Sequence, residues 1–379
     1  MSLDFAQEAF PGNDLHLELR RIREQEGPVA QVRFATRPAW IVIGHRALET
    51  AFKDEDAFPA GEWYRRSIEP IQGRTFESMD GSEHHLTRRL ATPAFRSSAV
   101  ARMEAEGLSH LAHELIDTFA DEGRGDLVSR FTARYPFLVV SRLLGIPTDR
   151  EQDFVGWALG ILSFDRGAAR AFTDFLRPVL QERRSEPRSD VISHLLHEEI
   201  EGRRFTDEEV LSHVRLLFSA GATTTHDALA SLIWLLLSKP ELAEAARADP
   251  GTLSGIIDEL LRWETPVAIL PRLCLPGTEL EGVRIPPEAP MLFAIAGANR
   301  DPEVFEEPDR FDPARDTRRK LTFGLGSHSC PGVHMARTNL RVAARALLER
   351  LPGLRLLDET AALPRGSTVR GSRELPVVW

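Results

Sequence analysis

Cysteine is scarce in this chain: its 379 residues include only Cys274 and Cys330, which excludes a disulfide framework as the source of stability. A protein without disulfides suits a reducing compartment, and we expect it in the cytoplasm. Long apolar runs are missing too, because none reaches the roughly 18 residues that a membrane-spanning helix needs. The N-terminal stretch MSLDFAQEAF carries acids where a signal peptide has basic and then apolar residues. We therefore expect neither secretion nor a membrane anchor.

An excess of basic charge is also lacking, since 47 Lys and Arg stand against 57 Asp and Glu and give a net charge of −10. General nucleic-acid binding requires a basic surface that pairs with phosphates, so this balance argues against it. The chain has no internal repeat, no low-complexity tract and no long linker. With 42% hydrophobic and 27% charged residues it can bury a sizeable core. We expect a single domain over residues 1–379.

The hydrophobic pattern predicts a mainly α-helical fold with a minor β portion. The segments 29–34 (VAQVRF) and 39–44 (AWIVIG) are predicted strands with a turn between them. From about residue 83 to 265 the pattern is mostly helical, with turn signals such as GIPTD and SKPE between segments. Prolines, short strands, a glycine-rich loop and one more helix follow.

The longest predicted helix runs from Thr206 to the Lys239-Pro240 pair. Thr206 and Glu209 make a capping box at its start, and the proline ends it. The roughly 32 residues between them would span about 48 Å, which is enough to cross a whole domain. Its middle, SAGATTTHDA, holds small residues and threonines, whose hydroxyls can bond back to helix carbonyls and bend the axis.

Two interpretations of this helix middle stay open from the residues alone. Small side chains can let another helix cross closely, which is the commoner reason for such a stretch. Alternatively, Ala220 and Gly221 make room for a flat ligand, with threonine hydroxyls supplied beside it.

The segment 323–332, FGLGSHSCPG, places Cys330 on a flexible loop just before the last helix. A buried structural cysteine or a phosphate loop without its lysine would explain parts of this pattern. A thiolate that binds heme iron must be stabilised against protonation, and glycines let a loop turn its amide N–H groups onto the sulfur. The positive end of the following helix adds to this effect. The joint pattern Phe-Gly-x-Gly-x-His-x-Cys-x-Gly would arise by chance in roughly one chain in a million, which favours the heme-thiolate interpretation.

This loop resembles the signature of the cytochrome P-450 superfamily of heme-thiolate enzymes, and the likeness covers nearly the whole chain. The resemblance implies heme b as the cofactor, with Cys330 as the axial ligand of its iron. Phe323 would pack beside that ligand, within a loop that includes Gly324 and Gly332. The resemblance also implies a cytochrome P-450 fold in which the heme lies between the long distal helix and the helix after the cysteine loop.

Two further segments carry the resemblance. ELLR at 259–262 matches the family's Glu-x-x-Arg helix, and PDRF at 308–311 supplies a third member. The resemblance implies that Glu259, Arg262 and Arg310 form a buried structural triad.

The stretch DGSEHHLTRRLATPAF at 80–95 is similar to the family's helix that passes beside the heme. It places His84 and Arg88 on one helical face, where both would hold a heme propionate. Arg272, in LPRL, matches the family's other propionate arginine, and His328 would reach a propionate from the cysteine loop. Two carboxylates that meet these four side chains suit charge-assisted hydrogen bonding.

The middle of the long helix departs from the family pattern. The family has small-Gly-x-acid-Thr, whereas this chain has Thr223 in place of the acid and Thr224 as the threonine. Ala220 and Gly221 would line the heme, and we expect Thr224 and Thr223 to be the catalytic residues. Because Thr223 cannot ionise, a proton relay would use hydroxyls and water, or a neighbour such as His226 or Asp227.

The resemblance implies a monomeric monooxygenase that hydroxylates an apolar small molecule. Electrons would come from NAD(P)H through a reductase and an iron–sulfur ferredoxin. Thr223 keeps two alternatives open: a peroxide-driven or nitric-oxide-reducing enzyme, and a non-catalytic heme sensor or binder. The family places substrate contacts at 58–74, 154–175, 267–270, in the long helix and near Val369. These segments are mostly apolar, and the first also carries Arg65, Arg66 and Glu69, so we expect an apolar substrate with one polar or acidic end.

Basic side chains gather around the cysteine loop in a chain that is otherwise acidic. They are either a solvated arginine face or, since they adjoin the thiolate side of the heme, a docking surface for an acidic ferredoxin. The group consists of Arg318, Arg319, Lys320, Arg337, Arg341 and Arg345. Cys274 has no motif around it and is expected to be a small packed hydrophobe.

Overall fold

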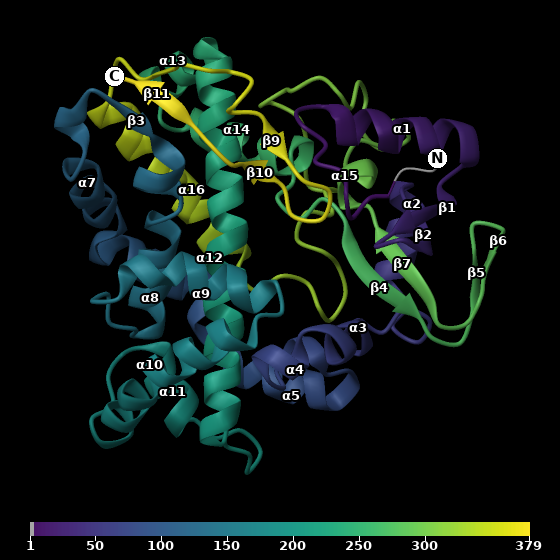
Figure 1. The fold of residues 1–379 in the computed structure, drawn as a ribbon, viewed down its shortest axis with the longest axis horizontal. Coiled ribbons are helices and arrows are strands. Elements are labelled where there is room, and N and C mark those ends of the chain that lie inside the picture. The colour runs from purple at the N-terminus through teal and green to yellow at the C-terminus, as the bar shows by residue number, and fades with distance from the viewer. Residues whose placement is uncertain (1–3) are drawn as a thin grey trace.

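The structure is a computed structural model that describes residues 4–379. The long helix α12 (Asp207–Ser238) runs through the middle of the molecule, as Figure 1 shows. Helices lie on both sides of α12 in this view, and the four-stranded sheet lies on one of these sides. The prediction of a mainly α fold with a minor β portion is confirmed.

The helices differ widely in length, and most fall between residues 81 and 263. In chain order they are α1 (Asp14–Glu26), α2 (His45–Lys53), α3 (Ala60–Ser67), α4 (Glu69–Gln72), α5 (Gly81–Ala91), α6 (Ser97–Met103), α7 (Ser109–Asp117), α8 (Tyr135–Leu144), α9 (Glu151–Leu162), α10 (Arg166–Ser185), α11 (Val191–His197), α12, α13 (Pro240–Ala248), α14 (Thr252–Trp263), α15 (Ile295–Ala298) and α16 (Val333–Arg350).

The strands are short and concentrate near both ends of the chain. They are β1 (Val29–Phe34), β2 (Arg37–Val42), β3 (Arg124–Asp126), β4 (Leu270–Cys274), β5 (Thr278–Leu280), β6 (Val283–Ile285), β7 (Ala289–Phe293), β8 (Arg355–Leu356), β9 (Pro364–Arg365), β10 (Gly371–Ser372) and β11 (Pro376–Val378).

The main sheet has the strand order β1-β2-β7-β4. β2 and β7 run parallel, while the other neighbours run antiparallel. The predicted first strand is observed, but the second begins earlier than predicted, at Arg37. Ala35 and Thr36 have φ values of 50° and 68°, so they form a tight hairpin turn that pairs Phe34 with Arg37.

The predicted ends of α12 are confirmed. Thr206 Oγ1 accepts a hydrogen bond from Glu209 N at 3.3 Å, and the Glu209 carboxylate accepts one from Thr206 N at 2.8 Å. The helix is 32 residues long, and α13 begins immediately after Lys239. In its middle, the hydroxyls of Thr223, Thr224 and Thr225 each donate to the carbonyl four residues earlier at 2.8 Å, as the sequence predicted.

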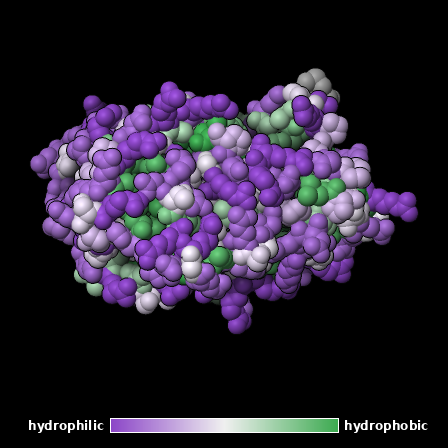
Figure 2. All heavy atoms as spheres, turned by 90° about the horizontal axis from the view of Figure 1, so that it is seen from below, coloured by the Kyte–Doolittle hydropathy of each residue, from purple (hydrophilic) through white to green (hydrophobic). Residues whose placement is uncertain are grey.

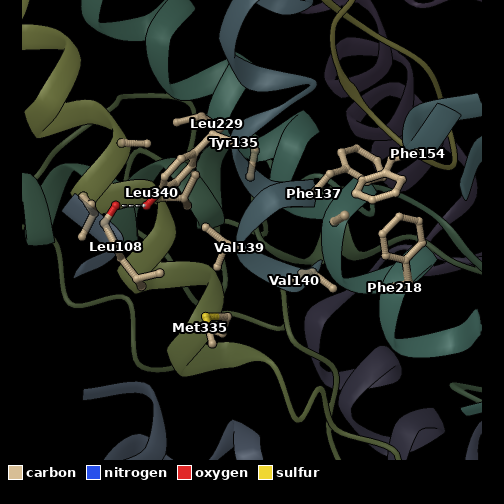
Figure 3. Packing of buried hydrophobic residues seen from close by; sticks show 14 of the residues in the cluster. Leu108, Tyr135, Phe137, Val139, Val140, Phe154, Phe218, Leu229, Met335 and Leu340 are labelled. Atoms are coloured by element: carbon tan, nitrogen blue, oxygen red, sulfur yellow. Dashed lines mark hydrogen bonds between the residues drawn. The ribbon is translucent and has the colours of Figure 1, made fainter. Parts of the chain in front are cut away.

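The largest core cluster surrounds α12. Figure 3 shows Phe137 of α8 and Phe154 of α9 next to Phe218 of α12, with ring centroids 5.6 and 5.3 Å from that of Phe218. A Cβ atom added to Gly221 would lie 3.5 Å from Val140 Cγ2, so the glycine sits where α8 crosses α12 closely. One face of the molecule, seen in Figure 2, is mainly hydrophilic with scattered apolar patches.

The buried pair on α14 stabilises the segment that precedes the cysteine loop. Glu259 and Arg262 are fully buried and are joined by hydrogen bonds of 2.7 and 2.8 Å. Arg315 Nε donates to the same carboxylate at 3.1 Å. The prediction that Arg310 completes this triad was wrong, because its side chain is 62% exposed and pairs with Glu307 and Asp312.

The backbone explains why Arg315 and not Arg310 reaches Glu259. The Arg310 carbonyl, rather than its side chain, faces the pair and accepts a hydrogen bond from Arg315 Nη2 at 3.1 Å. With the carbonyl directed inward, the Arg310 side chain extends into solvent. Arg315 also donates to the carbonyls of Glu306 and Glu307, so its guanidinium holds this turn against α14.

Replacing these two arginines separately tests the assignment. Arg315→Ala leaves part of a buried carboxylate unpaired, so we expect a loss of about 2 kcal/mol in the free energy of unfolding. Arg310→Ala removes only exposed ion pairs and should change that free energy by less than about 0.5 kcal/mol. Urea unfolding of both variants beside the unmodified protein measures the difference. Equal losses in the two variants would contradict the assignment of Arg315.

Candidate functional site

A cavity of about 280 Å³ lies between the middle of α12, the cysteine loop and the segment 266–272. Residues of α2, α3, α5 and α8 complete its wall. Most lining side chains are apolar, among them Phe76, Val140, Leu216, Val267 and Phe293. The charged and strongly polar groups in the wall are therefore few, and their positions define what the cavity can bind.

The cysteine loop takes a backbone conformation that requires glycine. Gly324 and Gly326 have φ values of 66° and 75°, in the left-handed region. A Cβ atom on Gly326 would lie 2.9 Å from the Phe52 carbonyl oxygen, so no larger residue fits there without a shift. The turn is closed by Cys330 N, which donates to the Phe323 carbonyl at 2.8 Å.

Two side chains from other elements anchor this loop. The Arg88 guanidinium donates to the Ser329 carbonyl. The Glu55 carboxylate accepts hydrogen bonds from the backbone N–H and the hydroxyl of Ser327. The loop is thus attached to α5 on one side and to the end of α2 on the other.

The Cys330 sulfur lines the cavity, which distinguishes it from Cys274. Cys274 is fully buried in the apolar cluster beneath the main sheet, as predicted for a packed hydrophobe. The surroundings of Cys330 act on its ionisation in opposite directions: burial raises the pKa of the thiol, while the Gly332 backbone N–H and Arg88 lower it. The N-terminal end of α16, which starts at Val333, adds positive potential.

A group of basic and imidazole side chains lies beside the sulfur. His84 of α5 is fully buried, and its ring stacks on that of His328 with centroids 4.0 Å apart. Burial lowers the pKa of His84 to about 4 and that of His328 to about 3, so both rings are neutral at physiological pH. The positive charges that line the cavity come from Arg88 and from Arg272 of β4.

Three imidazole nitrogens of this group lack hydrogen-bond partners within the described part of the chain. Neither ring nitrogen of His84 has a hydrogen-bond partner there, and His328 Nε2 has none either. Buried polar atoms without partners are costly, and a ligand with carboxylates would satisfy them. The two propionates of heme b fit this donor set: Arg88 and Arg272 would neutralise them, and His84 and His328 would donate to them.

The middle of α12 forms the opposite wall. Ala220, Gly221, Thr224 and Thr225 line the cavity, so the stretch borders a cavity and also lies where α8 crosses α12. Thr223 does not line it: its side chain is 3% exposed and donates to the Ser219 carbonyl. Successive helical residues point about 100° apart, which turns Thr223 away when Thr224 faces the cavity.

The two ionisable neighbours considered as a replacement for the missing acid also lie off the cavity. Asp227 is buried and pairs with Arg373 at 2.8 Å, and a Cβ on Gly371 would collide with it. His226 is not in the wall either. Within residues 4–379, no ionisable side chain of α12 lines the cavity.

Some of the expected substrate contacts are absent from the wall. The segment 154–175 packs behind it, since Trp157 and Phe172 have ring centroids 5.4 Å apart and Phe172 lies 4.6 Å from Phe218. Val369 is 38% exposed and does not line the cavity. The segments 58–74 and 267–270 do contribute, through Phe58, Tyr64, Val267 and Leu270 among others.

The two arginines that suggested an acidic substrate end do not face the cavity. Arg65 pairs with Glu62 and Asp80, and Arg66 pairs with Glu62 and Glu288. Neither arginine is in the cavity wall. The polar or acidic substrate end stays a prediction, without support from these two side chains.

Sequence reasoning missed Glu77, which lines the cavity beside Phe76. The stretch FESMD carries no motif, and a single acid in it gives no period that predicts a site. The only available signal was an acid placed between apolar residues just before the helix with His84 and Arg88.

Comparison with known proteins identifies the same family by a sequence model and by individual relatives. Residues 4–153 and 164–352 match the sequence model described as cytochrome P-450. The cyclomarin C epoxidase of Salinispora arenicola is 31% identical, over 97% of this chain and 96% of its own. The 6-deoxyerythronolide B hydroxylase of Saccharopolyspora erythraea is 32% identical, over 93% of each chain.

A solved structure has the same fold. A cytochrome P-450 from Chondromyces apiculatus superposes with a TM-score of 0.89 at 28% identity, covering 99% of this chain and 97% of that one. No helix within residues 4–379 combines the length and the apolar character needed to cross a bilayer.

Proposed function

The chain belongs to the cytochrome P-450 family of heme monooxygenases, and from this premise we propose that it hydroxylates an apolar small molecule. Electrons come from NAD(P)H through a reductase and an iron–sulfur ferredoxin. The observation that carries the proposal is a mainly apolar cavity in which the Cys330 sulfur and the Thr224 hydroxyl both lie in the wall.

Heme b is the cofactor of this family, and the residues present fit it. Cys330 would be the ligand of the iron, with Arg88, Arg272, His84 and His328 at the propionates. Heme with a thiolate ligand supplies the activation of dioxygen, since the sulfur donates electron density that favours O–O cleavage. The Gly332 N–H and Arg88 favour the thiolate form against the effect of burial.

The cavity wall supports oxidation by limiting bulk water and by holding one hydroxyl that can position a water molecule. Phe76, Leu216, Val267 and Phe293 surround the bound molecule with apolar surface, which limits access of bulk water. Thr224 Oγ1 donates to the Ala220 carbonyl at 2.8 Å and can still accept a hydrogen bond from a water molecule. Thr224 can thus position a water molecule at the wall, and that water is the proton source during oxygen activation.

A peroxide-driven reaction is the second candidate, and the absence of an ionisable side chain on the cavity face of α12 within the described residues favours it. Hydrogen peroxide supplies oxygen that is already reduced, so this route needs no acid for proton delivery. Turnover of one apolar compound by ferredoxin with NAD(P)H, compared with turnover by hydrogen peroxide, separates the two candidates.

Threonine variants make this comparison specific, with Thr223 as the matched control. Thr224→Ala should lower product formed per NAD(P)H about tenfold and release hydrogen peroxide instead, because the hydroxyl that positions the proton-donating water is lost. Thr223→Ala removes the same back-bonded hydroxyl off the cavity and should leave this ratio unchanged. Peroxide-driven turnover should be similar in both variants. An equal fall of the ratio in both variants would contradict a role for Thr224.

The basic group around the cysteine loop supports docking of a ferredoxin, although ion pairs reduce its free charge. Arg337 pairs with Asp258 at 2.6 Å, and Arg341 and Arg345 pair with Glu104 and Glu349 at 2.7 Å. Lys320 is buried against Asp258. Arg318 is 89% exposed and pairs with Asp316 at 2.5 Å. Arg319 is exposed and has no ion pair among the described residues, so the docking proposal rests on Arg319.

A charge reversal at Arg319 tests this docking surface. Arg319→Glu should slow ferredoxin-driven reduction several-fold at low salt, because electrostatic steering acts within a Debye length of about 8 Å at physiological ionic strength. Added salt should narrow the gap between the variant and the unmodified protein. Arg166→Glu, an equal charge change at the start of α10, serves as the control. If both reversals slow reduction equally, net charge and not a docking site is responsible.

A further inference from the structure

Glu77 is an acid in the wall of an otherwise apolar cavity. It lies in the short 3₁₀ helix Phe76–Ser78, immediately before α5. Its side chain is half-buried, and its open side faces the cavity. The polar neighbours that act on its carboxylate are Tyr64 and Gln72, through hydrogen bonds, and Arg272, through its charge.

The immediate neighbours of this carboxylate are polar but do not neutralise it fully. Burial raises the pKa of Glu77 to about 7, while Arg272, Tyr64 and Gln72 oppose that rise. Gln72 is 1% exposed, and both polar atoms of its amide lack a well-formed hydrogen bond with the described residues. Tyr64 lies under the Arg272 guanidinium, 5.1 Å from it, and also lines the cavity. This part of the cavity wall, formed by Glu77 and Tyr64 with Gln72 beside them, therefore has polar atoms that are free to bind a ligand.

The charges that line the cavity do not balance once heme is bound. The acids in the wall are Glu55 and Glu77, and the cations are Arg88 and Arg272. Glu55 is occupied by Ser327. The two propionates of heme add two negative charges and require both arginines, which leaves Glu77 without a cation. A buried carboxylate without a cation raises the free energy of the protein. This part of the cavity wall therefore favours a ligand that carries a positive charge.

We propose that Glu77, with Tyr64 and Gln72 beside it, selects substrates that carry a cationic amine group on an apolar body. The carboxylate pairs with the cation, the tyrosine ring contacts it, and the apolar wall holds the rest of the molecule. This assignment rests on the proposed function, because the bound molecule is the one that the enzyme oxidises. It specifies the predicted polar or acidic end of the substrate as a cationic group.

Three probes with the same alkyl chain and different ends test the proposal on the heme-loaded protein. One ends in a trimethylammonium group, which cannot coordinate iron, one in a hydroxyl and one in a carboxylate. Isothermal titration calorimetry should show the cationic probe binding about tenfold or more tightly than the hydroxyl probe, and the carboxylate probe most weakly.

Two variants test whether Glu77 is the residue that causes the preference for the cationic probe. Glu77→Gln keeps the size and polarity of the side chain and should reduce the affinity for the cationic probe about tenfold, with the hydroxyl probe unchanged. Glu83→Gln is the matched control, since Glu83 is an exposed acid of the nearby α5 that pairs with Arg74 and does not line the cavity. It should keep the full preference.

Several results would overturn the assignment. No preference for the cation in the unmodified protein, or the same preference in Glu77→Gln, would do so. A lower heme content in Glu77→Gln with the cation preference intact would show that Glu77 only supports Arg272. Ferredoxin-driven oxidation of the hydroxyl probe in the same preparations is measured in parallel. If that oxidation occurs without a cation preference, the assignment of Glu77 fails alone; if the preference occurs without oxidation of any probe, the proposed function fails alone.

Discussion

A cysteine sulfur held at the wall of a cavity is the constraint on which the rest of the structure depends. Burial works against the thiolate of Cys330, so the charge must be stabilised locally by the Gly332 N–H, Arg88 and the start of α16. The loop can present the sulfur in this way only because Gly324 and Gly326 take left-handed backbone conformations. The cavity wall opposite the sulfur is the middle of α12. Its small residues leave space for a bound molecule between the helix and the sulfur.

The scaffold around this site is connected by buried charges rather than by disulfides. Glu259, Arg262 and Arg315 fasten the segment before the cysteine loop to α14. A second buried set joins the two ends of the chain: Glu264 accepts from Arg370 and contacts His16, and these partners hold the pKa of Glu264 at about 2 despite its burial. Glu264 is the C-terminal capping residue of α14 and precedes β4, the strand that carries Arg272, by six residues.

The features that the sequence predicted correctly are those that neighbouring residues determine. The capping box of α12, the back-bonded threonines and the glycine loop depend on local chemistry, so their patterns are specific. The incorrect predictions concern side-chain direction over longer distances. Arg310 and Arg315 follow the same turn, and only the path of the backbone decides which one reaches Glu259. Likewise, Trp157 and Phe172 pack around Phe218 instead of facing the cavity, and Glu77 carries no pattern that marks it.

The most direct measurement is the absorption spectrum of the reduced, carbon-monoxide-bound protein. The account predicts the red-shifted Soret band that a thiolate ligand gives, and predicts that Cys330→His abolishes this band while heme can remain bound. Cys274→Ser should keep the band, since that cysteine is packed away from the cavity. A spectrum of the histidine-ligated kind in the unmodified protein, or a thiolate band that persists in Cys330→His, would contradict the account.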